Sequence, residues 1–341
     1  MRISESATPL PVAQKKEIKN WIMKIERLFI YCLLAGTFLL ASCSNENDVS
    51  DGDRLPEGQY PVTLTATGLG TTATTRTTAD DLWDSNEAVA VKIGDEVKNY
   101  VTASYGKRTK LNAAEGVIPF YWQSTGDIKV SAWYLGTGYD NGTLPTKWSV
   151  QTNQNPDGYQ KSDFLYAPQT DIDFKGTKPL TFYHQTAKVV VNIRNQGVVN
   201  HDDENIKSVT INAVTDGDFT TTLTKNCGLS AKAGVSPLEI NFYKLTQPNT
   251  VSFDGVEETA LASYKALVIP QAVSNTTITI NMKGYSPFKY TPTVPDQSGK
   301  WAGGTQYTYN LTIDGKEVKA SVTTNDMTWT KGNSGGGTVE I

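Results

Sequence analysis

The sequence is poor in the residues and motifs that most often carry enzymatic chemistry. Its 341 residues include two histidines and three cysteines. The Gly-Lys pairs lack the upstream glycine of a phosphate-binding loop, and no Gly-x-Ser-x-Gly nucleophile elbow occurs. A pair of glycosidase carboxylates is compatible with the sequence, but nothing singles out one pair. These absences disfavour an enzyme, and we expect no catalytic residues.

Cysteine is too scarce for a disulfide framework. Cys32 lies in an apolar segment near the N-terminus, Cys43 follows that segment, and Cys227 stands alone in the rest of the chain. A single thiol forms no internal disulfide, so an exported protein of this composition depends on its hydrophobic core. Cys227 is interpreted as an inert strand or turn residue, the alternative being a reactive thiol.

The histidines and acidic residues show no metal-ligand spacing. His184 stands at the head of an apolar strand pattern, which favours a hydrogen-bonded structural role. His201 precedes a run of acidic residues, which indicates a solvated loop, with a cation site as the alternative. Asp216 and Asp218 flank a glycine but lack the further ligands of a calcium loop, so a hairpin turn is predicted there. We expect no metal and no cofactor.

Positive charge is also limited. The formal net charge is −4, which argues against a basic nucleic-acid footprint, so no nucleic-acid partner is expected.

An uncharged and mostly apolar run, Leu28–Leu40, follows Lys24 and Arg27 and precedes small residues and Cys43. This order is typical of a secretory signal peptide, and the run is shorter than the ~20 residues that span a bilayer. We predict that residues 1–42 are a signal peptide, with Met23 as the favoured true start. The alternative is a buried apolar helix with an incidental cysteine.

Residues Leu40 to Cys43 resemble the lipobox of bacterial lipoproteins. The resemblance implies that Cys43 carries lipid and becomes the first residue of the exported protein. The next residues, up to position 58, are polar and acidic, which predicts a flexible tether over residues 43–58.

The next segment alternates with period two. Val62, Leu64 and Ala66 alternate with threonines, which predicts a half-buried strand. An uncharged threonine-rich run then leads to Arg76, where an exposed Arg76–Thr77 bond would suit a trypsin-like protease. The alternative is an ordinary loop arginine.

Short β-type patterns separated by turn residues continue from residue 87 to the C-terminus, with predicted strands at Val117–Trp122 and Thr305–Ile313 among them. This pattern predicts an all-β fold of tandem antiparallel β-sandwich domains. Asn-Gly and Asp-Gly pairs at 141, 157, 216 and 314 are predicted turns. A break at Asp173–Pro179 predicts domains at residues 77–177 and 178–341.

Tryptophan is the one residue type that suggests a ligand surface. A sugar platform is one interpretation, but aromatic side chains also fill sandwich cores, and the core is favoured for most of them. The residues concerned are Trp122, Trp133, Trp148, Trp301 and Trp329.

The order of several short motifs resembles the fimbrillin family, the subunits of type V pili. In chain order these motifs are the lipobox at Cys43, Thr75 to Thr77, Leu82-Trp83, Phe182 to Val191, Ile269 to Gln271, Gly304 to Leu311, and Asp326 to Trp329.

This resemblance implies two β-sandwich domains of the transthyretin-like or Greek-key kind. It also implies a lipoprotein of the outer membrane and cell surface that assembles with other pilin subunits. A trypsin-like protease would cut after Arg76, or less favourably after Arg54, which precedes the strand. The cut would remove residues 59–76 and open an apolar groove, and a neighbouring subunit's C-terminal strand would fill it. The receptor is not identified by the sequence.

The C-terminal end, about residues 317–341, contains two candidate donor segments with apolar residues spaced by two. The first contains Val318, Ala320 and Val322, and the second ends in Val339 and Ile341 after a glycine-rich stretch that suggests a hinge. The alternative is that these residues close their own sandwich. For the whole chain, the alternative function is a monomeric surface glycan-binding lipoprotein that keeps its first strand.

Overall fold

A computed structural model describes the chain from residue 53 onward, with gaps. The described residues are 53–68, 78–138, 142, 144–155, 157–174, 178–196, 203–219, 228–295, 298–314, 318–326 and 331–339. Within these ranges no helix is long and apolar enough to cross a membrane.

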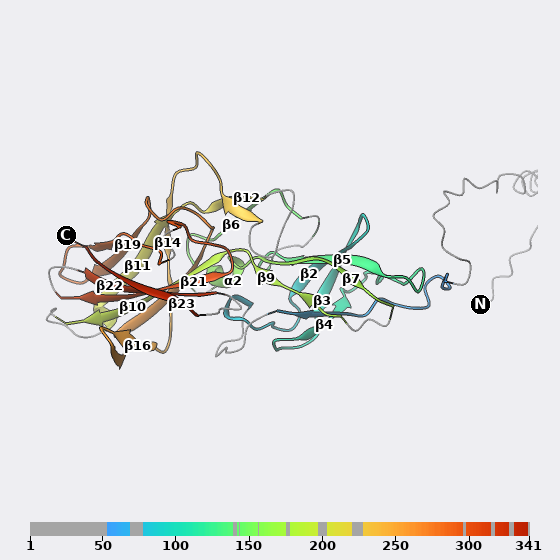
Figure 1. The fold of residues 1–341 in the computed structure, drawn as a ribbon, viewed down its shortest axis with the longest axis horizontal. Coiled ribbons are helices and arrows are strands. Elements are labelled where there is room, and N and C mark those ends of the chain that lie inside the picture. Colours follow the sequence, from blue (N-terminus) through green and yellow to red (C-terminus); the bar gives the residue numbers. More distant parts are fainter. Residues whose placement is uncertain are drawn as a thin grey trace, which may run out of the picture. The chain divides into compact units, whose positions relative to one another are not determined.

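An eight-stranded sheet contains the first seven strands except β6, and two short strands that follow them (Figure 1). Its order is β8-β1-β4-β3-β2-β5-β7-β9. The bounds are β1 (Leu64–Thr67), β2 (Ala88–Ile93), β3 (Glu96–Thr102), β4 (Thr109–Ala113), β5 (Ile128–Tyr134), β7 (Leu165–Ile172), β8 (Leu180–Thr181) and β9 (Tyr183–His184). All its pairings are antiparallel except β1 with β8.

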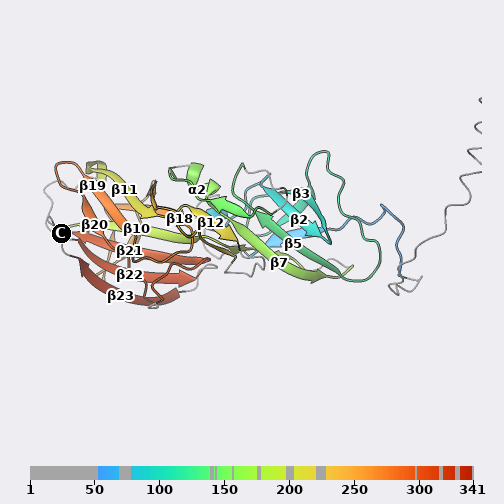
Figure 2. The same ribbon diagram turned by 90° about the horizontal axis from the view of Figure 1, so that it is seen from above.

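A six-stranded sheet, ordered β15-β18-β10-β21-β22-β23, forms the second large layer. Its strands are β10 (Ala187–Asn195), β15 (Tyr243–Lys244), β18 (Ala262–Val268), β21 (Thr305–Ile313), β22 (Val318–Asp326) and β23 (Lys331–Val339). The central pair β10–β21 is parallel, while β21, β22 and β23 follow one another antiparallel to the sheet edge (Figure 2).

Three smaller sheets and three short helices complete the described elements. The sheets contain β14 (Leu238–Asn241), β11 (Ile206–Ala213), β19 (Thr277–Met282) and β20 (Phe288–Tyr290); β13 (Leu229–Ala231), β12 (Asp216–Phe219) and β6 (Lys147–Ser149); and β16 (Thr250–Phe253) with β17 (Val256–Thr259). The helices are the 3-10 helices η1 (Thr78–Asp80) and η2 (Asp203–Asn205) and the α-helix α2 (Asp157–Lys161).

Two large hydrophobic clusters form the core of the described residues. One joins side chains of the eight-stranded sheet, such as Leu64, with Trp83 and Phe182 from the segments beside its strands. The other joins the six-stranded sheet and the β11–β19 sheet, with Tyr309 among its members, and also includes Trp133 of the eight-stranded sheet. Alternating burial along strands such as β19 matches the period-two patterns, because successive side chains of a strand point to opposite faces.

The all-β prediction is confirmed, but the sheets are mixed rather than wholly antiparallel. The tandem-domain count and its boundary at residue 178 stay predictions. Strands β8 and β9, which follow that residue, pair within the first sheet. The tether was predicted to reach residue 58, yet Leu55 donates its backbone N–H to Gln123 and Arg54 forms a bridge with Ser124.

Several local predictions were also wrong. Val117–Trp122 was predicted as a strand but forms only an isolated bridge at Tyr121, while β3 and β4 were missed. The Asp157-Gly158 pair begins α2 instead of forming a turn. Asp216 and Gly217 lie in strand β12 and not in a hairpin turn, because β12 is paired on both sides by β6 and β13.

Candidate functional site: the first strand and the segment that follows it

Strand β1 lies inside a sheet and not at its edge. On one side Leu64 pairs with Leu111 of antiparallel β4, and on the other Ala66 pairs with Leu180 of parallel β8. The chain before β1 is also paired, since the backbone N–H of Val62 donates to the carbonyl of Phe120 at 2.8 Å. Removing β1 would therefore leave two strands, β4 and β8, with unpaired backbone groups facing one gap.

The apolar side chains of this strand are core residues. Val62 is 5% exposed, Leu64 1% and Ala66 0%, and all three belong to the first hydrophobic cluster. Burying a Val or Leu side chain stabilises a fold by about 1.5–3 kcal/mol. The strand therefore contributes several kcal/mol of burial that another strand with the same spacing could supply. The burial fits the predicted pro-strand, whose removal stays a prediction.

Gly68 ends the strand at a very close contact. Its φ is +101°, and a Cβ built there would lie 2.4 Å from the carbonyl oxygen of Phe182. A side chain at this position would collide with backbone, so only glycine lets the chain leave β1 beside the β8–β9 segment.

Residues 69–77 lie outside the described ranges, and the next described segment is Thr78–Trp83, which we call the anchor segment. Thr78 is 1% exposed and Ala79 0%. The Asp80 carboxylate accepts a hydrogen bond from Lys188 Nζ at 2.9 Å and another from Lys265 Nζ. Both lysines are buried on strands of the six-stranded sheet, and losing one partner of such a buried pair typically costs about 3–5 kcal/mol.

The next acidic residue of the anchor segment, Asp81, contacts His184 in strand β9 of the eight-stranded sheet. Asp81 Oδ1 lies 3.2 Å from Nε2 of His184, while Asp163 Oδ1 lies 2.8 Å from its Nδ1. Asp81 has a φ of +68°, a conformation that non-glycine residues adopt infrequently. His184 therefore bridges two carboxylates, which confirms its predicted role as a hydrogen-bonded structural residue.

The electrostatics of this network favour its charged form. Burial by itself lowers the pKa of His184, but the charge of Asp163 and the hydrogen bonds that the ring donates to both carboxylates raise that pKa to about 9. A protonated imidazole donates from both ring nitrogens, as two carboxylate partners require. Burial also lowers the pKa of Lys265 to about 8, although Asp80 opposes this shift.

The predicted donor residues lie at the other end of the chain in their own sheet. Val318 is 2% exposed and begins β22, which pairs with β21 along its whole length. Ala320 and Val322 also lie in β22, and Val339 ends β23, the edge strand next to β22. Ile341 lies outside the described residues. The glycine-rich stretch forms part of strand β23 and not a hinge, and the donor role stays a prediction.

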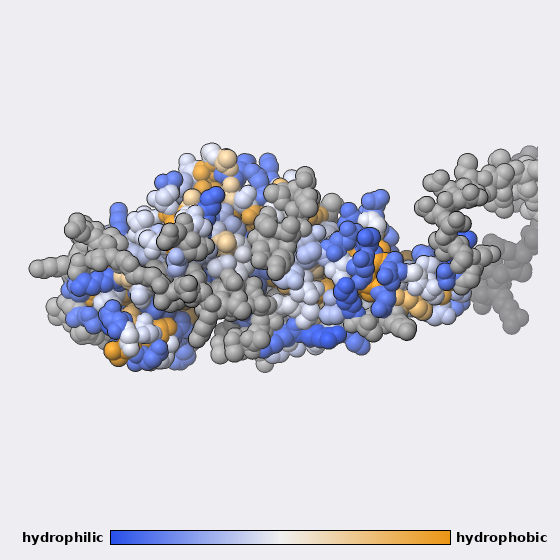
Figure 3. Space-filling view, viewed as in Figure 1, coloured by the Kyte–Doolittle hydropathy of each residue, from blue (hydrophilic) through white to orange (hydrophobic). Residues whose placement is uncertain are grey.

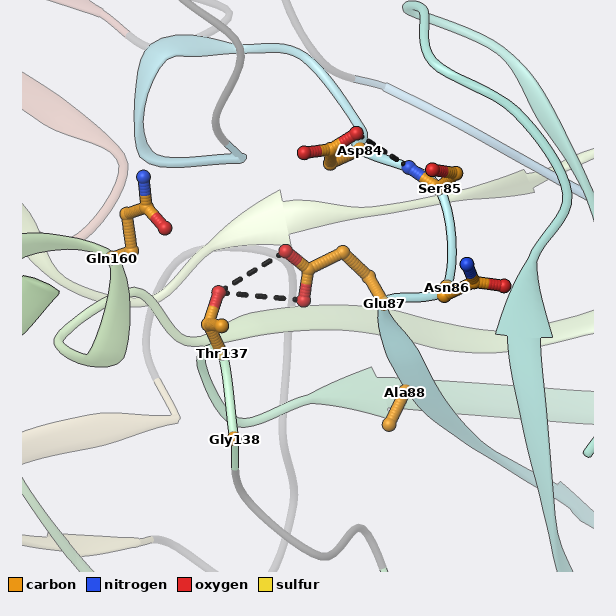
Figure 4. Close-up of a pocket in the computed structure, with 8 residues that line it drawn as sticks. All are labelled: Asp84, Ser85, Asn86, Glu87, Ala88, Thr137, Gly138 and Gln160. Carbon is orange, nitrogen blue, oxygen red and sulfur yellow. Dashed lines mark hydrogen bonds between the residues drawn. The ribbon is translucent and has the colours of Figure 1, made fainter.

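A polar recess of about 530 Å³ lies beside the anchor segment and is lined by Asp84, Glu87, Thr137 and Gln160 among others (Figure 4). Thr137 Oγ1 donates to Glu87 Oε1 at 3.1 Å, and burial raises the pKa of Glu87. The lining residues include no aromatic side chain, and the described part of the chain holds no group of His, Cys, Asp and Glu suited to a metal ion. We assign no ligand to this recess.

The remaining sequence candidates are accounted for as follows. Four of the five candidate tryptophans, Trp122, Trp133, Trp148 and Trp301, are at most 4% exposed, which confirms the core interpretation over a sugar platform. The face in Figure 3 is mostly hydrophilic over the described residues, with hydrophobic residues in small patches. The candidates Cys43, Arg76, Thr77, His201, Cys227 and Trp329 lie outside the described residues.

Sequence reasoning missed the charged network around Asp80 and Asp81. The available signal was a lysine inside each of two apolar strands, Lys188 and Lys265, because a buried lysine requires an acidic or hydrogen-bonding partner. Nothing in the sequence identifies that partner.

Comparison with known proteins gives a consistent result. A family model described as fimbrillin-like matches residues 71–327. A protein of Bacteroides uniformis named "Putative fimbrium subunit Fim1C" is 24% identical over 344 residues, which cover 91% of this chain and 97% of that protein.

Two solved structures, each described as a "putative cell adhesion protein", have similar folds. The one from Bacteroides uniformis has a TM-score of 0.59 at 19% identity and covers 80% of this chain and 99% of its own. The one from Bacteroides ovatus has a TM-score of 0.53 at 16% identity and covers 82% of this chain and 99% of its own. Identities this low establish a shared fold only.

Proposed function

The chain belongs to the fimbrillin-like family, and from this premise we propose that it is a fimbrium subunit whose first strand is removed and replaced by a strand of a neighbouring subunit. Family membership makes it a structural subunit of a cell-surface fimbrium, assembled with other pilin subunits, and not an enzyme. The observation that carries the finer proposal is the position of β1 between β4 and β8, where its loss opens a gap with two unpaired strands.

Strand replacement is physically suited to this gap. A backbone edge and an apolar groove together offer hydrogen bonds and hydrophobic burial to an incoming strand with period-two side chains. An exposed edge normally promotes aggregation, but an incoming strand from one neighbour makes the contact directional. Repetition of that contact, head to tail, would build a fibre.

Lipid-anchored export is the first step of the proposed pathway. The apolar run before Cys43 and the lipobox-like Leu-Ala-Ser-Cys sequence support it. We expect a palmitate analogue to label cells that express the chain, and Cys43→Ala to abolish the labelling. Unchanged labelling of that variant would contradict lipidation at Cys43, and with it the proposed anchoring in the outer membrane.

Cleavage after Arg76 is the second step. Both flanks of the interval 69–77 are fixed, at Gly68 by its backbone contact and at Thr78 by burial, and Arg76 is the only basic residue between them. Arg54 supports the proposal less well, because a cut there leaves β1 attached to the fold.

Limited trypsin digestion of the folded protein should therefore cut first at the Arg76–Thr77 bond, and the large fragment should begin at Thr77. Arg76→Ala should abolish that fragment, whereas Arg108→Ala, which removes an exposed arginine in the turn between β3 and β4, should leave it unchanged. N-terminal sequencing identifies the cut. A first cut at Arg108, or at Arg194, whose guanidinium pairs with Glu258 at 3.0 Å, would contradict the proposal.

The donor strand is proposed to come from the C-terminal end. Among the described strands β23 is an edge strand of its sheet, with β22 as its neighbour, and its interior is rich in glycine. Glycine weakens a strand because it has no side chain to pack, so β23 is the easier of the two to release. Release of β22 as well requires the loss of its full pairing with β21.

A further inference from the structure

Removal of β1 would leave β8, on one side of the gap, without its strand neighbour, although the following strand β9 stays paired with β7. Among the described strands, β8 has β1 as its one neighbour in the order of the eight-stranded sheet. The N–H of Phe182, directly after β8, donates to the carbonyl of Thr67 at 2.9 Å, so this hydrogen bond would be lost as well. An incoming strand pairs well only if the stretch Leu180–His184 stays where β1 left it.

The anchor segment contacts this stretch at two points. The Asp81 carboxylate accepts a hydrogen bond from Nε2 of His184. Asp163, which lies two residues before the start of β7, accepts one from the other ring nitrogen. The Trp83 ring lies edge-on to the Phe182 ring, with centroids 5.0 Å apart. These contacts come from residues that follow the proposed cut, so cleavage does not remove them.

The anchor segment is in turn held by β10 and β18 of the six-stranded sheet and by helix α2. Lys188 Nζ donates to the Ala79 carbonyl at 3.2 Å as well as to Asp80, and the Tyr159 hydroxyl donates to the same carbonyl at 3.1 Å. Lys265 lies over the Tyr159 ring, 4.6 Å from its centroid. The new chain end at Thr77 would therefore begin one residue before a buried and multiply bonded segment.

We infer that Asp81 and His184 are positioning residues for strand exchange, which keep the Leu180–His184 side of the gap in place after β1 has left. The inference rests on the proposed removal of β1. It assigns to the anchor segment a role that begins only after cleavage, because in the uncleaved chain β1 itself supports β8.

The first test follows the His184 ring in the wild-type protein. The chain has two histidines, so nitrogen-labelled imidazole spectra are simple, and His201→Gln identifies the signals of His184. Both ring N–H protons should exchange slowly with water in the uncleaved protein. They should exchange equally slowly in the cleaved protein from which the released fragment has been separated. Loss of these signals from the separated protein would overturn the positioning role alone. Retention of the fragment after cleavage would instead overturn the proposed function.

The second test measures how well the gap accepts a strand. A synthetic peptide of residues 59–76 is titrated into cleaved protein from which the released fragment has been separated. This titration measures strand binding to one subunit and does not require polymerisation. Asp81→Asn should weaken peptide binding by about tenfold or more, because apparent affinity falls with the fraction of molecules in the competent state. The matched control Glu87→Gln, a neighbouring carboxylate bonded to Thr137, should bind like wild type. Equal binding by Asp81→Asn would overturn the inference.

Discussion

A chain that lacks residues 332–341 is expected to fold and to be cleaved by trypsin, but to form no SDS-resistant ladders by itself. The deletion removes nearly all of β23, which is paired with β22 along one side only, so the six-stranded sheet keeps β22 as its new edge. The gap left by β1 lies in the other sheet and is unchanged. The truncated subunit would therefore accept a strand without donating one.

Because the truncated subunit should accept a strand but donate none, a mixture with intact subunits provides a control. Mixed with intact, cleaved subunits, the truncated chain should be incorporated at one end of each polymer and should shorten the ladders in proportion to its share. Circular dichroism and the thermal midpoint of the uncleaved truncated chain check that it folds. If it forms ladders as long as those of intact protein, the last ten residues are not part of the donor.

The second large effect is expected from Leu64→Ala, which should lower the free energy of unfolding of the uncleaved protein by about 2–5 kcal/mol. Leu64 is 1% exposed in the first hydrophobic cluster and stands opposite Leu111 in the register of β1 and β4. Alanine leaves a cavity there, and the surrounding sheet relaxes only in part. Denaturant unfolding of the purified variant measures the loss.

The same substitution should have no effect after maturation, because the fragment that begins at Thr77 no longer contains position 64. Thr65→Ala, at the neighbouring half-buried position on the opposite face of β1, is the matched control and should change stability by less than about 1 kcal/mol. If the cleaved and separated Leu64→Ala protein were destabilised as much as the uncleaved one, β1 would not have left the fold.

The sequence by itself determined the fold class and the local state of its strongest segments. Thr305–Ile313 was predicted as a strand with the same bounds that the structure has, and Val62, Leu64 and Ala66 were predicted to share one buried face. Both results follow from the alternation of apolar and polar residues with period two, which can be recognised within a short stretch of sequence. The short, polar strands β3 and β4 were missed because Glu96–Thr102 and Thr109–Ala113 contain too few apolar residues to show that period.

Only the tertiary structure decided which strands are neighbours and which charges meet. The parallel pairing of β10 with β21 and the insertion of β1 between β4 and β8 join segments far apart in the chain, and no local pattern encodes that choice. The same holds for Asp80 at the end of η1, whose two lysine partners come from separate strands of the six-stranded sheet. Burial in a low-dielectric interior makes these pairings strong, because each charge left unpaired there would cost several kcal/mol (~3–5), and that environment exists only once both sheets have packed.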